Sequence, residues 1–214
     1  MDAALRMFAE KSVDATTIEE ITELADLGKG TFYGHFSGKE EVVVALVEDV
    51  VNRLIEALKA ARPQPRNLHE AVDRLLAVHG DFFLSDHDAF VLLFQGRLLL
   101  KLRRDATEDL GQPYLRYLQE VEACLAPFAA QPIEREKVRR LAYAVAGFVS
   151  GFFSFAMIGL AAEEIEKSLG PMRQAFVAAS EAFLSSQGVS SPPEPGVAAG
   201  QPQGPPRAIV ETKQ

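Results

Sequence analysis

Apolar residues recur along most of the chain at the three-to-four-residue spacing of helices that bury one face. No segment alternates apolar and polar residues in the manner of a strand. The pattern predicts an all-α protein of about nine helices. The predicted helices cover residues 2–12, 17–25, 29–35, 38–61, 68–83, 87–104, 113–130, 133–161 and 170–187.

Several helix ends carry local signals. At three predicted starts, a polar capping residue stands three positions before a glutamate: Thr17 with Glu20, Ser37 with Glu40, and Asn67 with Glu70. Pro63 and Pro65 lie in the segment 61–67, where they cannot continue the preceding helix. This loop is the clearest break between a small N-terminal unit and a larger C-terminal one. Residues 188–214 are rich in proline and glycine and have no period, so we expect a disordered tail.

Residues 17–42 form two helical segments separated by a short turn. Residues 17–25 place Ile18, Ile21 and Leu24 on one side, and the turn Asp26-Leu27-Gly28 has the length that joins two helices at a steep angle. The next helix, residues 29–35, is short, and only Phe32 and Phe36 are spaced as core contacts. This pattern predicts a helix-turn-helix.

The short helix leaves its remaining side chains for contacts outside the protein. Lys29, Thr31, Tyr33 and His35 offer an ammonium, a hydroxyl, a phenol and an imidazole, and Gly30 leaves room for a close approach of the backbone. Such groups suit DNA phosphates and base edges. Lys39 opens the following helix, whose free amides can also hold a phosphate.

The stretch "AALRMFAEKSVDATTIEEITELADLGKGTFYGHFSGKEEV", and above all its core "GTFYGHFSGKEE", resembles the N-terminal signature of the tetracycline-repressor (TetR) family of transcriptional regulators. The resemblance covers about residues 3–47. It implies that the second helix supports the third, that the third enters the major groove, and that the fourth leads into a ligand-binding domain. The implied DNA contacts are Thr17, Lys29, Gly30, Thr31, Tyr33, His35 and Lys39.

The implied domains are a helix-turn-helix domain at 1–47, an effector-binding and dimerisation domain at 48–187, and the tail at 188–214. Three positions depart from the family pattern. Asp26 and Ser12 stand where glycine is usual, and Gly28 replaces a serine before the recognition helix. Aspartate tolerates left-handed geometry better than most residues, and glycine is an acceptable cap, so we expect the turn to form.

The charge balance limits how strongly the chain can bind DNA. The whole chain has a net charge of −8 and a pI near 5.1. Residues 1–50 hold four basic and eleven acidic residues, and the basic arm that many relatives place before the first helix is missing, unless the true start lies upstream of Met1. Few phosphates can be neutralised, so we expect modest affinity with a shallow salt dependence.

The central helices of the second unit are rich in aromatic residues and carry nine phenylalanines: Phe82, Phe83, Phe90, Phe94, Phe128, Phe148, Phe152, Phe153 and Phe155. Aromatics at helical spacing pack in cores, but an aromatic-rich helical domain with a few polar groups also binds apolar ligands. We expect a small lipophilic or aromatic effector here, with His79 and Tyr114 as further polar groups. The candidate ligand contacts are Phe82, Phe90, Phe94, Gln95, Arg97, Tyr117, Tyr143, Phe148 and Phe152.

Residues 141–162 carry no charge and are long enough to cross a bilayer, and Gly147 and Gly151 have the spacing that lets helices approach closely. A membrane anchor is one reading. The other follows from the family resemblance, which implies a homodimer through the helices at 133–161 and 170–187. An alternative function is therefore a helical binding module, with or without a membrane anchor at 141–162, whose DNA binding is weak or lost.

Other chemistry finds little support in the sequence. Cys124 is the only cysteine, and the four histidines show no paired-ligand spacing, so we expect neither disulfide, metal nor cofactor. The stretch "GKGT" at 28–31 lacks the spacing of a phosphate-binding loop, and no nucleophile motif is present, which argues against an enzyme.

The N-terminus lacks a secretion signal, so we expect a cytoplasmic protein. The sequence thus predicts a ligand-responsive repressor that binds operator DNA.

Overall fold

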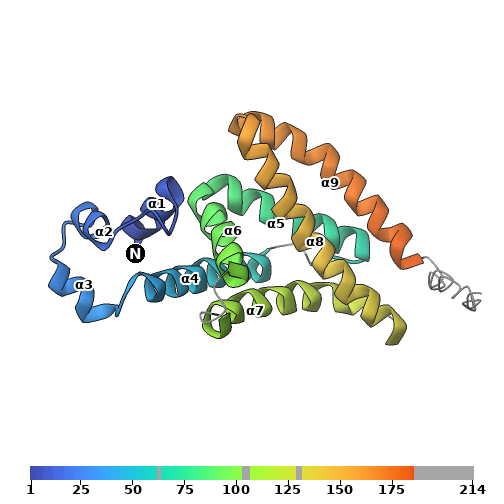
Figure 1. Ribbon diagram of the computed structural model, residues 1–214. Helices are drawn as coiled ribbons and strands as arrows, with labels where there is room; N and C mark the ends of the chain where they lie inside the picture. The colour runs from blue at the N-terminus through green and yellow to red at the C-terminus, as the bar shows by residue number, and fades with distance from the viewer. Residues whose placement is uncertain (62–63, 103–106, 129–131, 186–214) are drawn as a thin grey trace, which may run out of the picture.

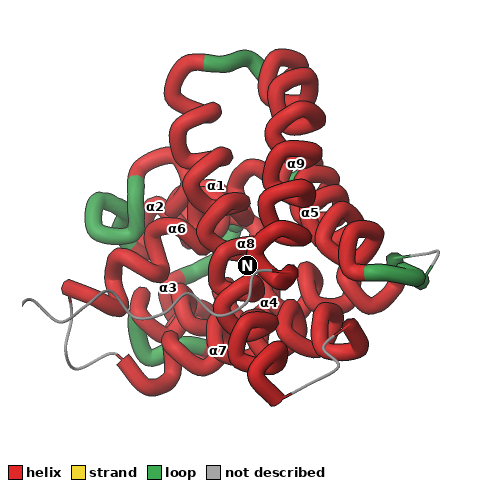
Figure 2. The backbone as a smooth tube through the Cα atoms, turned by 90° about the vertical axis from the view of Figure 1, so that its right-hand side faces the viewer, coloured by secondary structure: helices red, strands yellow, loops and turns green. Residues whose placement is uncertain are grey.

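The computed structural model describes residues 1–61, 64–102, 107–128 and 132–185, and this part of the chain consists of helices joined by loops (Figures 1 and 2). The nine α-helices of the described residues confirm the all-α prediction. They are α1 Asp2–Lys11, α2 Ile18–Leu24, α3 Lys29–His35, α4 Lys39–Ala60, α5 Leu68–Ser85, α6 His87–Leu102, α7 Thr107–Leu125, α8 Pro132–Gly159 and α9 Ala162–Ser185, with a short 3₁₀ helix, η1, at Ala126–Phe128.

Helices α1 to α3 form one end of the molecule, and α4 runs from them into the larger bundle of α5 to α9 (Figure 1). The turn that joins α8 to α9 lies at the top of both views, and α8 runs down from it to the far end of the bundle (Figures 1 and 2). Helix α4 carries a continuous buried stripe that includes Val43, Val47, Val50 and Leu54, so it belongs to the cores of both parts. The predicted tail at 188–214 lies outside the described residues.

Two helices begin earlier than the sequence predicted. Helix α7 begins at Thr107 instead of 113, and α9 at Ala162 instead of 170, so Pro113 and Pro171 lie inside helices. A proline inside a helix costs ~3 kcal/mol. The turns before the prolines nevertheless bury Leu110 in α7, and Ile165 and Leu169 in α9, and this burial offsets the cost.

The three predicted capping boxes have different outcomes in the structure. Thr17 and Glu20 form the expected reciprocal box. Asn67 accepts from the Glu70 N–H, but the Glu70 carboxylate accepts from the Arg66 N–H instead of closing the box. The prediction at 37–40 is wrong: Gly38 is the cap residue of α4, and the Ser37 N–H and hydroxyl both donate to the carboxylate of Glu41. Ser37 lies one residue before the cap of α4, and its hydrogen-bond partner is the carboxylate of Glu41 in the first turn of that helix.

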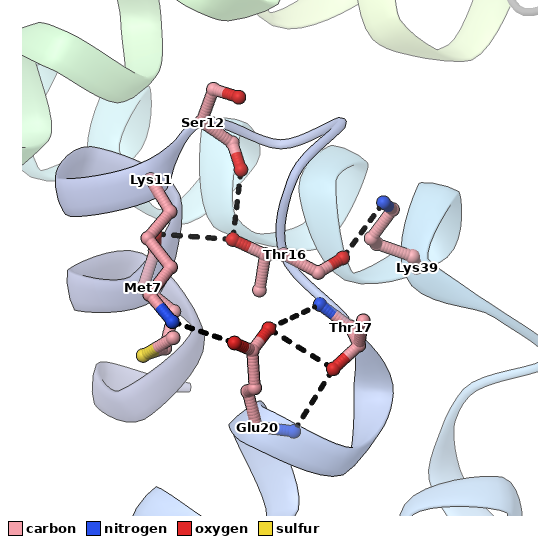
Figure 3. Close-up of polar contacts among 7 residues, drawn as sticks. All are labelled: Met7, Lys11, Ser12, Thr16, Thr17, Glu20 and Lys39. Atoms are coloured by element: carbon pink, nitrogen blue, oxygen red, sulfur yellow. Dashed lines mark hydrogen bonds and ion pairs between the residues drawn. The ribbon is translucent and has the colours of Figure 1, made fainter.

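The two positions where glycine was expected by resemblance have positive φ angles. Asp26 has φ 53°, in the left-handed region that aspartate tolerates, and the helix-turn-helix forms. Ser12, directly after α1, has φ 78° and ψ 157°, a combination that is found almost only in glycine. Thr16 supports this corner, because its Oγ1 lies 3.1 Å from the Met7 carbonyl oxygen and 2.8 Å from that of Ser12 (Figure 3).

Replacing Ser12 by glycine should therefore stabilise the protein. We expect Ser12→Gly to raise the free energy of unfolding by about 1 kcal/mol, because it removes left-handed strain and gives up only a long 3.4 Å contact from the Ala15 N–H. Thermal or denaturant unfolding measures the change. Ala178→Gly, at an exposed position inside α9, is the control and should lose about 1 kcal/mol. A loss of stability in Ser12→Gly would show that the corner is not strained.

Candidate nucleic-acid interface and ligand cavity

Helix α3 presents most of its surface to solvent. Phe32 is buried and Phe36 half-buried, with ring centroids 5.7 Å apart, and they hold the helix against the N-terminal core. Successive residues turn by about 100° around a helix. Lys29 and Tyr33 therefore flank this anchored side on one edge, and Thr31 and His35 on the other; all four are exposed, Tyr33 by 57%.

The side of α3 directly opposite the phenylalanines carries only Gly30 and Gly34. A Cβ atom built at either position meets no other atom within 4 Å, so neither glycine is required by packing inside the chain. The outermost part of the helix is thus bare backbone between two edges of polar side chains. Such a surface can approach another molecule closely.

The cations of the N-terminal helices are engaged with acceptors of the protein. Three of them form exposed ion pairs: Arg6 with Glu10, Lys11 with Glu20, and Lys29 with Glu19. The contact with Lys29 lowers the pKa of Glu19. Exposed pairs of this kind contribute little and can exchange for another anion. A phosphate must compete with carboxylates that are already in place.

Lys39 and Thr17 are held more firmly (Figure 3). The Lys39 ammonium donates to the carbonyl oxygens of Asp14, at 3.2 Å, and Thr16, at 2.9 Å, which leaves one of its three N–H groups for another acceptor. The Thr17 hydroxyl is within hydrogen-bond distance of both the Glu20 carboxylate and the Glu20 N–H. The hydrogen bond from Lys11, together with those from Thr17, lowers the pKa of Glu20 to about 2. Thr17 therefore serves the corner between α1 and α2.

A cavity of about 290 Å³ lies in the larger bundle, between α4, α5, α6, α7 and α8. Its wall is mostly aliphatic and aromatic. It is lined by Val51, Leu54, Phe83, Phe90, Leu93, Arg97, Tyr114, Tyr117, Leu118, Tyr143, Ala146, Gly147, Val149 and Ser150. Tyr143 is more than half exposed and marks the rim.

The structure brings only some of the predicted ligand residues together here. Phe90, Arg97, Tyr117 and Tyr143 line the cavity. Phe148 and Phe152 instead line an open apolar groove with Phe155 and Met172, and neither Phe82 nor Phe94 lies in the cavity wall. The prediction overlooked the aliphatic residues of α4 and the small residues of α8, which carry no distinctive sequence pattern.

Gln95 does not line the cavity at all. Its side-chain oxygen accepts from the Val13 N–H and its amide donates to the Phe8 carbonyl, both at 2.9 Å, so it joins α6 to the end of α1. The next residue, Gly96, lies where α6 crosses α4 and α7: a Cβ there would collide with Tyr114 and come within 3.2 Å of Val47. Helix α6 thus touches the helix-turn-helix unit with one face and the cavity with the other.

His79 and two tyrosines organise the cavity wall. His79 is fully buried, and its Nδ1 lies 2.6 Å from the Leu75 carbonyl, which can only accept, so Nδ1 carries the proton. Its Nε2, 2.7 Å from the Tyr117 hydroxyl, then accepts the tyrosine proton. Burial lowers the pKa of His79 to about 4 and keeps the ring neutral. Tyr114 donates to the Leu93 carbonyl at 2.8 Å.

Arg97 is the charged residue of this wall. Its guanidinium donates to the Ser150 hydroxyl on α8 and lies 5.7 Å from the centroid of the Phe94 ring. Burial raises the pKa values of Tyr114 and Tyr117, while the positive charge of Arg97 acts in the opposite direction. Within the described residues, no group of three histidine, cysteine or acidic side chains is arranged to hold a metal.

The hairpin of α8 and α9 exposes large apolar side chains. On α8, Phe155 is 79% and Ile158 81% exposed, and Met172 on α9 is about half exposed. By length and composition, Arg135–Gly159 is the one helix of the described chain that could span a membrane; a third of its most apolar window is buried. The buried side, with Val145, Val149 and Phe153, packs on the bundle.

Comparison with known proteins extends this description. Residues 1–46 match the family model described as bacterial regulatory proteins, tetR family. The chain is 25% identical over 123 residues to the uncharacterized HTH-type transcriptional regulator YvdT of Bacillus subtilis, covering 56% of this chain and 62% of YvdT. It is 34% identical over 125 residues to IcaR, the negative transcriptional regulator of the biofilm operon icaADBC of Staphylococcus epidermidis, covering 58% and 62%. The chain thus spans less than two thirds of these relatives.

Solved structures share the fold over a greater length. FadR of Bacillus subtilis, in complex with stearoyl-CoA, has a TM-score of 0.59 and 19% identity over 86% of this chain and 92% of its own. The fatty acid degradation regulator FadR of Bacillus halodurans has a TM-score of 0.61 and 17% identity, over 87% and 96%.

The three N-terminal helices, with the exposed outer face of α3, define a helix-turn-helix protein. The match over residues 1–46 identifies this N-terminal part as a helix-turn-helix of the kind found in the tetR family of bacterial regulatory proteins.

The buried neutral His79 makes stability depend on pH. Its pKa falls from 6.5 in the unfolded chain to about 4 in the fold, so the unfolded chain binds the extra proton between these values and stability falls as pH falls through this window. We expect a loss of about 2 kcal/mol between pH 7 and pH 5 from this residue.

Denaturant unfolding at several pH values measures this slope. His79→Gln should be less stable at pH 7 but should lose much of the pH dependence between 7 and 5. His87→Gln, at an exposed histidine, is the control and should keep the full slope. An unchanged slope in His79→Gln would contradict a neutral buried imidazole.

Proposed function

We propose that this protein is a cytoplasmic, ligand-responsive transcriptional repressor. It binds operator DNA as a homodimer, with α3 of each subunit in the major groove, and releases the DNA when a small lipophilic or aromatic effector occupies the cavity. The observation that carries this proposal is the α3 surface: bare backbone at Gly30 and Gly34, bordered by Lys29 and Tyr33 on one edge and by Thr31 and His35 on the other.

The proposed DNA contacts follow from that surface. Gly30 and Gly34 allow the helix backbone to lie close to base edges, and the flanking side chains supply donors for bases and phosphates. Lys39 contributes its remaining N–H group to a phosphate from a fixed position. Because the other cations must leave carboxylates first, binding is modest and its salt dependence shallow.

The proposal of an effector is supported by the cavity and by a solved protein of the same fold. An apolar cavity with a few polar groups is the usual form of a small-molecule site. FadR of Bacillus subtilis, which shares the fold, was solved with a lipophilic ligand, stearoyl-CoA. In this chain the wall includes Leu93 and Arg97 of α6, and the same helix holds α1 through Gln95. An effector that moves α6 moves the helix-turn-helix unit with it.

The dimer proposal explains the exposed apolar surface of the α8–α9 hairpin. A second copy packed against Phe155, Ile158 and Met172 would bury side chains that water surrounds in the single chain. The domain division at 1–47 and 48–187 follows from this assignment of roles. Two α3 helices related by the dimer axis would meet successive major grooves, ~34–36 Å apart. A bilayer could cover the same surface, which is the anchored alternative.

The variant Gly30→Ala tests whether Gly30 is needed for contact with DNA or for the stability of the protein itself. The added methyl group meets open space and alanine is the better helix former, so the variant should be about 1 kcal/mol more stable. It should nevertheless bind the duplex flanking the protein's own gene about tenfold more weakly in gel-shift titrations, because the methyl group holds the helix away from base edges. Asn52→Ala, an exposed change on α4, is the control that leaves DNA binding unchanged. Full DNA affinity in Gly30→Ala would refute the assigned interface.

A charged residue introduced into the exposed apolar surface of the α8–α9 hairpin tests the proposed dimer interface. Phe155→Glu or Ile158→Glu should convert the dimer to a monomer, since burying an unpaired carboxylate in an interface costs more than ~2 kcal/mol. Light scattering after gel filtration measures the mass. Leu24→Glu, at an exposed apolar position of α2, should stay dimeric. A dimer that persists in both hairpin variants contradicts the interface, and wild-type protein that sediments with membranes supports the anchored alternative.

A further inference from the structure

We infer that the effector is a small apolar carboxylic acid whose carboxylate binds the Arg97 guanidinium. The inference rests on the proposed ligand role of the cavity and adds the chemical class of the ligand. It comes from the distribution of charge and hydrogen-bond donors in the cavity wall.

The chain has 30 acidic and 22 basic residues, yet the cavity wall contains one charged residue, and that residue is basic. Within the described part of the chain, Arg97 forms no ion pair; its partners are the neutral Ser150 hydroxyl and the Phe94 ring. A guanidinium has five N–H donors in a planar fork that matches a carboxylate. Most of these donors have no acceptor among the residues that the structure describes. A half-buried cation without an anionic partner is costly unless a ligand supplies one.

The hydroxyl groups of Tyr114 and Tyr117 do not compete for this role. Tyr114 donates its proton to the Leu93 carbonyl, and Tyr117 donates its proton to Nε2 of His79. Both tyrosine oxygens are thereby left as acceptors. The positive charge that an anionic head group needs is at Arg97, with the Ser150 hydroxyl beside it, whereas the described residues of the wall offer no carboxylate to a cationic ligand.

The volume of the cavity and its single positive charge further narrow the class of ligand. About 290 Å³, at ~30 Å³ for each water-sized group, holds on the order of ten non-hydrogen atoms. One guanidinium balances one negative charge. A phosphate monoester carries about −1.5 to −2 at neutral pH and would leave charge uncompensated among apolar side chains. An acid with a short aromatic or aliphatic body fits both limits.

Matched pairs of acids and amides test the inference. Calorimetric titration of the full-length protein at pH 7 compares 3-phenylpropanoate with 3-phenylpropanamide, and octanoate with octanamide. We expect at least one acid to bind about tenfold more tightly than its amide, as a charge-assisted hydrogen bond predicts. Arg97→Gln should reduce the affinity for that acid to the level of the amide, and Arg97→Lys should keep part of the preference.

Arg116→Gln is the matched control, because it removes an exposed arginine that pairs with Glu48 outside the cavity wall, and it should keep the acid preference. The inference is overturned if neither acid binds better than its amide, if none of the four compounds binds, or if stearoyl-CoA alone binds and does so equally to wild type and Arg97→Gln. Gel shifts without any added compound, made on the same samples, report separately whether the proposed DNA-binding function holds.

Discussion

The pair of hydrogen bonds made by Gln95 joins the two halves of this molecule. The side-chain amide of Gln95 donates to the Phe8 carbonyl oxygen in α1 and accepts from the Val13 N–H just beyond that helix. Loss of the Gln95 side chain would leave the part-buried Val13 N–H without this acceptor, at a cost of ~1–3 kcal/mol. The Phe8 carbonyl would keep its hydrogen bond from the Ser12 N–H. The position of the end of α1 therefore depends on the position of α6. Because α6 also supplies Phe90, Leu93 and Arg97 to the cavity, we propose that a ligand in the cavity acts on the orientation of the N-terminal helices through this helix.

The N-terminal unit combines a surface shaped for DNA with an unfavourable charge. Its acidic residues hold Lys11 and Lys29 in ion pairs and thereby order the corners between the helices. The same pairs reduce the positive charge available for phosphates. In the proposed DNA complex, close approach of the backbone at Gly30 and the fixed position of Lys39 would supply much of the binding. A modest affinity of this kind would need only a small coupling free energy for release, as the proposed response to a ligand requires.

Much of the fold could be predicted from sequence because it depends on local patterns. The period of apolar residues located the helices, Thr17 and Glu20 marked a helix start, and Phe32 with Phe36 identified the anchored side of α3. The starts of α7 and α9 could not be predicted, because burial of Leu110 and Leu169 outweighs the local effect of proline. The role of Gln95 and the full cavity wall depend on how distant helices cross, which no local pattern records.

We propose above all that this acidic chain recognises a two-fold symmetric DNA site through paired α3 helices. An unbiased selection of bound sequences from random duplexes, with the full-length protein at low ionic strength, tests it directly. We expect enrichment of two inverted half-sites whose centres lie one helical turn, ~34–36 Å, apart. Recovery of no preferred sequence, or of a single unpaired half-site, would contradict it.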